Sequence, residues 1–137
     1  MKIRNYHQSD IESVISLWTE VFNPVQHHNN PKVAINMKIK NNDNLFFIAE
    51  EKNQIIGTII SGFDGHRGWL YSLAVHPDYR RKGIGTTLVK KALDELKKLG
   101  CLKVNLQIYS NNKNVKDFYE KNGFLIEDRI SMGKKMY

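Results

Sequence analysis

The 137-residue sequence predicts one mixed α/β (α+β) domain in which helices flank a single sheet. Short β-rich runs alternate with segments whose apolar residues recur at helical spacing. Cap and turn residues separate these runs, and no repeat or low-complexity linker divides the chain. A content of 41% hydrophobic and 26% charged residues suits one core at this length. We therefore expect a single domain over residues 1–137.

The N-terminal part predicts a strand followed by two helices. Residues 1–6 (MKIRNY) form the expected strand. Ser9 and Glu12 have the spacing of a capping box, which predicts a helix start at Ser9. The apolar face of this first helix comprises Ile11, Val14, Ile15, Trp18, Val21 and Phe22. Residues 23–30 predict a loop, and Asn30-Pro31 predicts the cap and first-turn proline of a second helix reaching about Ile39.

The middle of the chain predicts three strands and a long helix. Two β-rich runs within residues 45–62 flank Lys52-Asn53-Gln54 and predict an antiparallel hairpin. The glycine-rich turn 62–68 (GFDGHRG) leads into an expected strand over 69–75 (WLYSLAV). The helix that follows is expected to end with Gly100 as its C-cap. Its apolar stripe comprises Ile84, Leu88, Val89, Ala92, Leu96 and Leu99.

The C-terminal part predicts further strands around a short helix. Residues 101–109 (CLKVNLQIY) read as a strand, and a helix containing Val115, Phe118 and Tyr119 stops at Asn122-Gly123. Residues 124–137 supply one or two closing strands. The complete order predicts a sheet of six to seven strands flanked by about four helices.

Composition limits the possible surroundings and partners. A formal charge of +7 and a pI near 9.5 predict attraction to an anionic partner. No run of 18 apolar residues and no apolar signal region is present, so we expect a cytoplasmic protein without a membrane partner. Cys101 is the only cysteine, and we expect it to be a small buried residue rather than a reactive thiol.

The segment 76–88 (HPDYRRKGIGTTL) combines positive charge, glycine and a helix start. A helix start presents unpaired backbone N–H groups and the positive end of the helix dipole, and glycine lets an anion approach that backbone. The segment therefore predicts a phosphate-binding site. It matches neither the G-x-x-x-x-G-K-[ST] motif nor the three-glycine dinucleotide fingerprint. The alternative interpretation is a solvated charge run followed by a glycine turn.

These residues resemble the signature R/Q-x-x-G-x-G/A of the GCN5-related N-acetyltransferases (GNAT family). Here it reads Arg80-Arg81-Lys82-Gly83-Ile84-Gly85, preceded by LAVHPDYR, and a second family segment recurs as NKNVKDFYEKNGF, residues 112–124. The resemblance covers essentially the whole chain and implies a mixed, mainly antiparallel sheet. Within the family, GFDGHRG, YSLAVHP and SMGKKM look most like the small bacterial YpeA-type proteins.

The resemblance implies acetyl-coenzyme A as co-substrate, no metal, and transfer of the acetyl group to a primary amine by direct attack. Tyr119 matches the family's general acid. The backbone N–H groups from Arg81 to Thr86 would hold the pyrophosphate, and the strand around Leu73 and Val75, with Asn112, would hold the pantetheine arm. The implied cofactor-binding residues are Leu73, Val75, Arg80, Arg81, Lys82, Gly83, Gly85, Thr86 and Asn112.

The general base is the point at which the sequence departs from the family pattern. Several relatives place a glutamate on the strand equivalent to 69–75 or at the position of Gln107, whereas this strand has no carboxylate and glutamine cannot accept the proton. Tyr71, Ser72 or His66 could order a proton-carrying water, and Glu50 or Asp64 could reach the site. Each is also explained as a sheet-packing or turn residue.

Other interpretations stay open at this stage. His27 and His28 could contact an acceptor, but they fit loop residues better and have no nearby ligand set for a metal. A non-catalytic acetyl-coenzyme A sensor would explain the missing glutamate. A nucleic-acid-binding module would explain the charge, but the coenzyme's phosphates already account for the clustered cations, so we expect no nucleic acid partner. The acceptor is a small molecule or a peptide, and the protein a monomer or homodimer.

Overall fold

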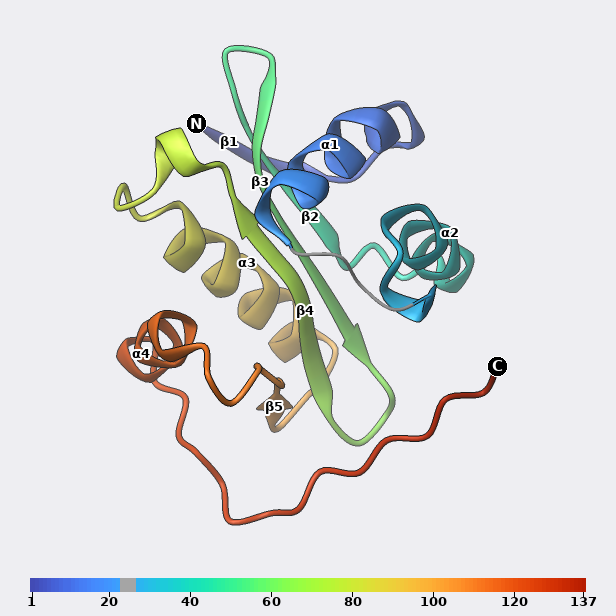
Figure 1. Ribbon diagram of the computed structural model, residues 1–137, viewed down its shortest axis with the longest axis vertical. Helices are drawn as coiled ribbons and strands as arrows, with labels where there is room; N and C mark the ends of the chain where they lie inside the picture. The colour runs from blue at the N-terminus through green and yellow to red at the C-terminus, as the bar shows by residue number, and fades with distance from the viewer. Residues whose placement is uncertain (23–26) are drawn as a thin grey trace. The chain divides into compact units, whose positions relative to one another are not determined.

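The computed structural model describes residues 1–22 and 27–137 (Figure 1). The chain divides into two compact units, Met1–Leu106 and Gln107–Tyr137, which are considered in turn. The predicted loop over 23–30 is described only in its last part, because residues 23–26 lie outside the described ranges. Among the described residues, no helix is long and apolar enough to cross a membrane.

The N-terminal unit contains one five-stranded sheet in the order β1-β2-β3-β4-β5. Its strands are β1 (Lys2–Asn5), β2 (Phe46–Glu51), β3 (Gln54–Phe63), β4 (Gly68–Val75) and β5 (Val104–Asn105). The first three pairings are antiparallel and only β4–β5 is parallel. The predicted mixed, mainly antiparallel sheet is confirmed, and so is the β2–β3 hairpin.

Three helices cover the two faces of this sheet (Figure 1). They are α1 (Ile11–Val21), α2 (Pro31–Asn41) and α3 (Ile84–Lys98). Helices α1 and α2 bury one face in the cluster Val14, Leu17, Trp18, Ile35, Phe46, Ile48, Ile60 and Ala74. Helix α3 covers the opposite face, where Lys91 lies over the Phe47 ring and the Ile84 and Leu88 side chains approach Gly57. Side chains alternate between faces along β2 and β3, so each face has its own apolar set.

The start of α1 differs from the expectation based on Ser9. A short 3₁₀ helix, Gln8–Asp10, precedes α1, and Asp10 rather than Ser9 occupies the N-cap. The Asp10 carboxylate accepts the His7 backbone N–H at 2.8 Å and two N–H groups of Arg4 at 2.8 and 3.0 Å. The capping-box prediction was wrong because an ion pair with β1 fixes this turn.

The start of α2 and the end of α3 agree better with the sequence. Asn30 Oδ1 accepts the N–H groups of Lys32 and Val33 at 3.1 and 3.3 Å, which confirms the predicted cap. The C-cap of α3 is Leu99, and Gly100, which was predicted as the C-cap, lies one residue further on with φ of 88°, in the left-handed region that glycine favours just after a helix. The predicted stripe of α3 is buried except for Leu99, which follows the helix and is exposed.

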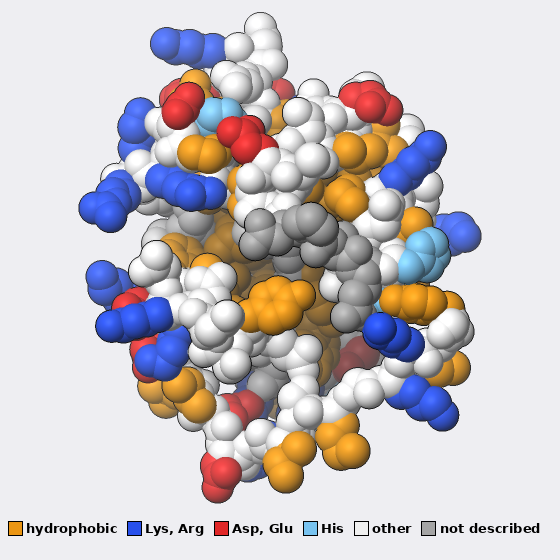
Figure 2. Space-filling model, viewed as in Figure 1, with side chains coloured by type: hydrophobic (Ala, Val, Ile, Leu, Met, Phe, Trp, Pro, Cys, Tyr) orange, Lys and Arg blue, Asp and Glu red, His pale blue; other side chains and the backbone are white. Residues whose placement is uncertain are grey.

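The strand count is lower than predicted. The expected strand over 101–109 is reduced to the two residues of β5, and no strand is assigned within 124–137. Leu125, Ile126, Ile130 and Met132 of this segment are exposed, and Figure 2 shows apolar side chains along it open to solvent. β-propensity expresses the fit of a side chain to a pleated, half-buried surface, so apolar residues alone do not form a strand without a partner.

The C-terminal unit contains the fourth predicted α-helix, α4 (Lys113–Lys121). Asn112 caps its start, because Oδ1 accepts the Val115 N–H at 3.3 Å. Gly123 follows its end with φ of 91°, as the predicted Asn122-Gly123 stop requires. The expectation of about four helices is confirmed.

Candidate functional site: the outer edge of β4 and the start of α3

Strand β4 contains a bulge at Ser72. Two residue steps along β3, from Thr58 to Ile60, span the same length as three steps along β4, from Tyr71 to Ala74. Ser72 absorbs the extra residue with φ of 51°, a left-handed conformation that is uncommon for a non-glycine residue. The bulge therefore changes which backbone groups point out of the sheet on either side of it.

The backbone of Leu73 and Val75 faces away from β3. The His76 N–H donates to the Ile56 carbonyl at 2.8 Å, and backbone direction alternates along a strand. Ala74 therefore faces β3, while Leu73 and Val75 face the opposite edge. In the described residues, β5 pairs with β4 only at Gly68 and Trp69. The edge that the family resemblance assigns to the pantetheine arm thus lies beyond the end of the β4–β5 pairing.

The turn after β4 connects this edge to the basic loop. Pro77–Tyr79 forms a 3₁₀ helix whose start is capped by His76 Nδ1, which accepts the Asp78 N–H at 3.1 Å. Arg80 then folds back, and its Nε donates to the Val75 carbonyl at 3.1 Å. The first cation of the predicted phosphate site is therefore attached to the last residue of β4.

The start of α3 has the backbone that the sequence predicts for an anion site. Gly83 is the N-cap with φ of 79°, and a Cβ placed there would meet no atom within 4 Å. The Thr87 N–H and hydroxyl both bond to the Gly83 carbonyl, at 3.0 and 2.8 Å. The N–H groups of Ile84, Gly85 and Thr86 precede the first intrahelical bond and have no acceptor within the helix. Open space thus adjoins the start of this 15-residue helix.

Positive charge gathers over this loop. Arg80, Arg81 and Lys82 are all exposed, and Figure 2 shows basic side chains over the loop at the upper left of the view. Arg81 has φ of 63°, and the Lys82 ammonium lies 5.2 Å from the centre of the Tyr79 ring. Helix dipole and cations together attract an anion to the same backbone.

The remaining predicted residues, Asn112 and Tyr119, belong to the C-terminal unit. The cap bond of Asn112 uses its Oδ1, so the amide nitrogen takes no part in it. Tyr119 is 7% exposed and packs edge-to-face against Phe118 and Phe124, with centroids 5.1 and 5.4 Å away. Burial raises the pKa of Tyr119 to about 12. Its phenol therefore stays protonated at neutral pH, as a general acid must.

Two of the suggested general bases are held in other interactions. The Glu50 carboxylate pairs with Arg4 at 2.9 Å, on the strand pair farthest from β4. Asp64 accepts the Arg67 and His66 N–H groups at 2.7 and 2.8 Å in the β3–β4 turn, and these bonds hold the pKa of its carboxyl below its usual range. Asp64 thus fits a turn residue, and a lowered pKa makes it a weak base.

Tyr71 and Ser72 lie beside the bulge, whereas His66 does not. Tyr71 pairs with Ile60 across the strands, so its side chain is on the α1 and α2 face, where it is 54% exposed. Burial, and then the charge of Asp64, raise the pKa of its phenol. His66 lies in the turn before β4, where its Nε2 is 3.2 Å from Arg67 Nη1. Of the suggested water-ordering groups, Tyr71 and Ser72 are adjacent to the backbone edge.

The histidines form no metal site in the part of the chain that the structure describes. His27 and His28 lie in the 3₁₀ turn His27–Asn29 and are exposed. No group of three or more potential ligands from His, Cys, Asp and Glu occurs among the described residues. Cys101, which was expected to be buried, is partly exposed, and its thiol donates to the Lys103 carbonyl at 3.3 Å.

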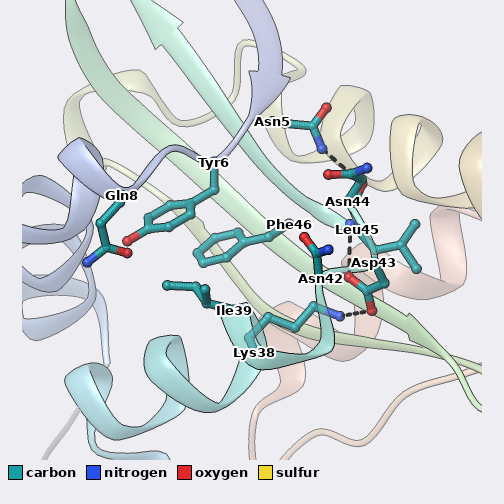
Figure 3. Close-up of a pocket in the computed structure, with 10 residues that line it drawn as sticks. All are labelled: Asn5, Tyr6, Gln8, Lys38, Ile39, Asn42, Asp43, Asn44, Leu45 and Phe46. Atoms are coloured by element: carbon teal, nitrogen blue, oxygen red, sulfur yellow. Dashed lines mark hydrogen bonds and ion pairs between the residues drawn. The ribbon is translucent and has the colours of Figure 1, made fainter.

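A separate hollow of about 160 Å³ lies at the β1–β2 side of the sheet and includes none of the predicted site residues (Figure 3). The Tyr6 and Phe46 rings stack within it at 4.5 Å. Its polar side chains bond locally: Lys38 to Asp43 at 2.7 Å, and Asn5 Nδ2 to the Asn44 carbonyl at 2.9 Å. These bonds tie α2 and β1 to the connection between α2 and β2, so we attribute the hollow to packing.

Sequence reasoning missed the interactions that shape the β4 edge. Nothing in WLYSLAV indicates a bulge, because serine is not a residue that a positive φ requires. The Arg80–Val75 bond also has no sequence signal, since every residue has a backbone carbonyl and the residue type does not show which one accepts the bond. The glycine and cations of the predicted phosphate site, in contrast, lie as expected: Gly83 adjoins open space, and the three cations are exposed.

Comparison with known proteins agrees with this geometry. The sequence model of the acetyltransferase (GNAT) family matches residues 11–124. Acetyltransferases of Pectobacterium atrosepticum and Yersinia enterocolitica are each 38% identical over 136 residues, covering 99% of this chain and 96% of theirs. The chain belongs to the GNAT family of acetyltransferases. Whether this GNAT chain is of the YpeA type stays a prediction.

Solved structures show the same GNAT fold. The PaiA N-acetyltransferase of Thermoplasma acidophilum, determined in complex with coenzyme A, matches with a TM-score of 0.81 and 25% identity over 94% of this chain and 92% of that chain. An aminoglycoside 6'-N-acetyltransferase of Acinetobacter haemolyticus matches with a TM-score of 0.78 over 100% and 99% of the two chains. Its identity of 16% supports the fold alone.

Proposed function

We propose that this GNAT chain is an N-acetyltransferase that moves the acetyl group of acetyl-coenzyme A to a primary amine. The observation that carries the proposal is that the Arg80 side chain connects the edge of β4 to the start of α3. Arg80 bonds to the β4 edge at Val75, and the glycine-led start of α3 follows three residues later. A ligand that carries both phosphate and a chain of amides fits this combination.

The pyrophosphate of the coenzyme is assigned to the loop and helix start. Gly83 leaves open space beside the N–H groups of Ile84, Gly85 and Thr86, and backbone N–H groups at a helix start bind phosphate oxygens. Arg80, Arg81 and Lys82 neutralise further phosphate charge. The Thermoplasma acidophilum relative was solved in complex with coenzyme A, which supports coenzyme A as the ligand.

The pantetheine arm is assigned to the outer edge of β4. Leu73 and Val75 direct backbone groups to this edge, where the amides of the arm can pair as an added strand would. The Val75 carbonyl already accepts from Arg80, so the Val75 N–H and the Leu73 carbonyl are the groups assigned to the arm. The family resemblance assigns Asn112 to the same arm.

The transfer is a direct attack. The neutral amine forms a C–N bond to the thioester carbonyl, the C–S bond breaks, and the sulfur leaves with the electron pair. The Leu73 N–H polarises the carbonyl oxygen while charge develops on it. Tyr119 donates its phenolic proton to the leaving thiolate and regains one from solvent, and its pKa of about 12 keeps the phenol protonated beforehand.

The amine loses its proton through water rather than to a carboxylate of β4. An alkylammonium has a pKa near 10.4, so only about a thousandth is neutral at pH 7. Tyr71 is half exposed beside the bulge, and its raised pKa keeps it neutral, so it can hold a water by hydrogen bonds without acting as the base itself. This assignment predicts a rate that rises with pH as the amine deprotonates.

Calorimetry tests the coenzyme site. Acetyl-coenzyme A is titrated into wild type, Gly83→Ala and Gly65→Ala at two salt concentrations. Both glycines have positive φ and open space, with φ of 79° and 94°, so both substitutions introduce the same backbone strain. We expect micromolar binding by wild type and Gly65→Ala, and a large loss in Gly83→Ala. Absence of binding by folded wild type would overturn the proposal.

Turnover then separates an enzyme from a sensor. Release of the coenzyme A thiol is followed while acetyl-coenzyme A is presented with a panel of primary amines, comprising amino acids, polyamines, aminoglycosides and peptides. Amine-dependent thiol release supports the transferase. Tight binding without release by any amine would favour the non-catalytic sensor.

A further inference from the structure

We propose that Trp18 and Thr58 are positioning residues that hold the β4 bulge, so that the Leu73 N–H points at the thioester carbonyl. The inference rests on the proposed acetyl transfer and extends it to two residues that lie on α1 and β3, away from the coenzyme edge. It assigns a role to a hydrogen-bond chain through the core of the N-terminal unit.

The chain has two bonds and a single direction. Trp18 Nε1 is 2.8 Å from Thr58 Oγ1, and Thr58 Oγ1 is 3.0 Å from the Ser72 carbonyl oxygen. An indole N–H can only donate and a carbonyl can only accept, so the Thr58 hydroxyl accepts from Trp18 and donates to Ser72. The Thr58 hydroxyl proton therefore points at the carbonyl oxygen of Ser72, the bulge residue.

The bond to Ser72 holds the residue at which β4 changes direction. Before the bulge, the Gly68 N–H faces β5 and donates to the Lys103 carbonyl at 2.9 Å. Simple alternation from Gly68 would turn the even-numbered residues outward and point Leu73 at β3. The extra residue reverses this order, and Leu73 faces the outer edge. Without the left-handed Ser72, the proposed carbonyl-binding N–H would point into the sheet.

The surroundings leave no substitute for the Thr58 hydroxyl. Thr58 is 0% exposed and Trp18 is 2% exposed, so water does not replace the bond from solvent. Loss of the hydroxyl leaves the indole N–H and the Ser72 carbonyl without this partner, and unpaired buried polar groups favour a rearranged backbone. The left-handed Ser72 is the strained residue in that region and is the one that such a rearrangement would relieve.

The test compares Thr58→Val with two matched variants. Valine has nearly the shape of threonine but no hydroxyl, while Thr58→Ser keeps the hydroxyl. Ser61→Ala is the control, because Ser61 is also 0% exposed on β3 and its hydroxyl donates to a backbone carbonyl, that of Leu45, at 3.0 Å. Thr58→Val and Ser61→Ala thus each remove one buried hydroxyl, but only Thr58→Val removes it from the bulge.

The readout is the stretching band of acetyl-coenzyme A labelled with ¹³C at the thioester carbonyl, measured bound to each variant. A hydrogen bond to the carbonyl lowers this frequency. We expect the lowered band in wild type, Thr58→Ser and Ser61→Ala, and loss of most of the shift in Thr58→Val. Calorimetric affinity should change less than about threefold in all three variants, since the phosphate site is intact. Turnover of Thr58→Val should fall about tenfold or more. Deleting a donor to the carbonyl oxygen slows such enzymes at least about a hundredfold, and a misdirected donor loses part of the same stabilisation.

Each outcome is decisive. A full shift in Thr58→Val, or an equal loss in Ser61→Ala, overturns the positioning role while leaving the acetyltransferase proposal intact. An absence of acetyl-coenzyme A binding by wild type overturns the acetyltransferase proposal, and this inference with it. If Thr58→Val does not fold, Trp18→Phe replaces it: it removes the N–H that orients the hydroxyl, a partial loss of shift supports the inference, and an unchanged band overturns it.

Discussion

The Nε of Arg80 donates to the Val75 carbonyl oxygen at 3.1 Å, so the end of β4 orients the first cation of the basic loop. This bond uses one of the five guanidinium N–H groups. Because the guanidinium is planar, the bond also fixes the orientation of the two terminal nitrogens, whose N–H groups stay available. The same bond uses a carbonyl on the strand edge that would otherwise face the pantetheine arm. The strand edge and the phosphate loop therefore act as one unit.

Replacing Arg80 by lysine should weaken acetyl-coenzyme A binding roughly tenfold or more. Lysine keeps the charge but cannot donate to Val75 and to a phosphate with one planar group, and a hydrogen bond to a charged group contributes about 1.5–3 kcal/mol. Calorimetry on Arg80→Lys measures the change. Arg129→Lys, at an exposed arginine of the C-terminal unit, should leave the affinity unchanged. Equal affinities for wild type and Arg80→Lys would contradict this role.

The Tyr119→Phe variant should turn over about a hundredfold more slowly or worse, with nearly unchanged affinity for acetyl-coenzyme A. General acid catalysis contributes about 10²–10⁴-fold, and phenylalanine preserves the edge-to-face contacts with Phe118 and Phe124. Because the pKa of Tyr119 is about 12, wild type should lose no rate from ionisation of this phenol between pH 7 and 10. Tyr109→Phe, at an exposed tyrosine of the same unit, is the control. A wild-type rate in Tyr119→Phe would remove Tyr119 from the mechanism.

The elements that could be predicted from the sequence are those fixed by local chemistry. The Asn30-Pro31 helix start, the β2–β3 hairpin and Gly83 at the start of α3 follow from side chains or backbone preferences within a few residues. The cap at Ser9 failed because Arg4, which also pairs with Glu50 on the neighbouring strand, binds the Asp10 carboxylate. A local pattern cannot anticipate a competing partner from another strand.

The same distinction applies to the candidate site. Gly83 and the three cations stand in one short segment and were predictable, whereas the Ser72 bulge depends on a bond from Thr58, 14 residues earlier. Strands were predicted in residues 124–137 but none is assigned there, because apolar residues show that a segment can pair and not that a partner strand is present. Register and pairing are tertiary properties, so they emerge only with the sheet.

Gly57→Ala should destabilise the protein by about 1–3 kcal/mol through overpacking between β3 and α3. A Cβ at Gly57 would lie 3.0 Å from Leu88 Cδ1 and 3.2 Å from the Ala74 carbonyl oxygen. Gly62→Ala, on the same strand, is the matched control, since its Cβ would approach only the Lys38 ammonium, at 3.7 Å. Urea unfolding measures both variants. A Gly57→Ala midpoint equal to that of Gly62→Ala would show that α3 has room to move.

Asp10→Asn should remove much of the acid sensitivity of the fold. The side-chain bonds from Arg4 are the largest cause that lowers the pKa of the Asp10 carboxyl below its ordinary 3.8, followed by the His7 N–H. A carboxyl with a lowered pKa in the folded state stabilises that state above its unfolded pKa, and this contribution is lost as the pH falls through the folded pKa.

Wild type should therefore lose stability progressively below about pH 4, whereas Asp10→Asn should be less stable at pH 7, by about 1–3 kcal/mol, and change less steeply in acid. Urea unfolding at pH 7, 4, 3 and 2.5 gives the two profiles. Asp128→Asn removes an exposed carboxylate of the C-terminal segment and should follow the wild-type profile. Parallel profiles for wild type and Asp10→Asn would mean that the Arg4–Asp10 pair does not set the acid limit.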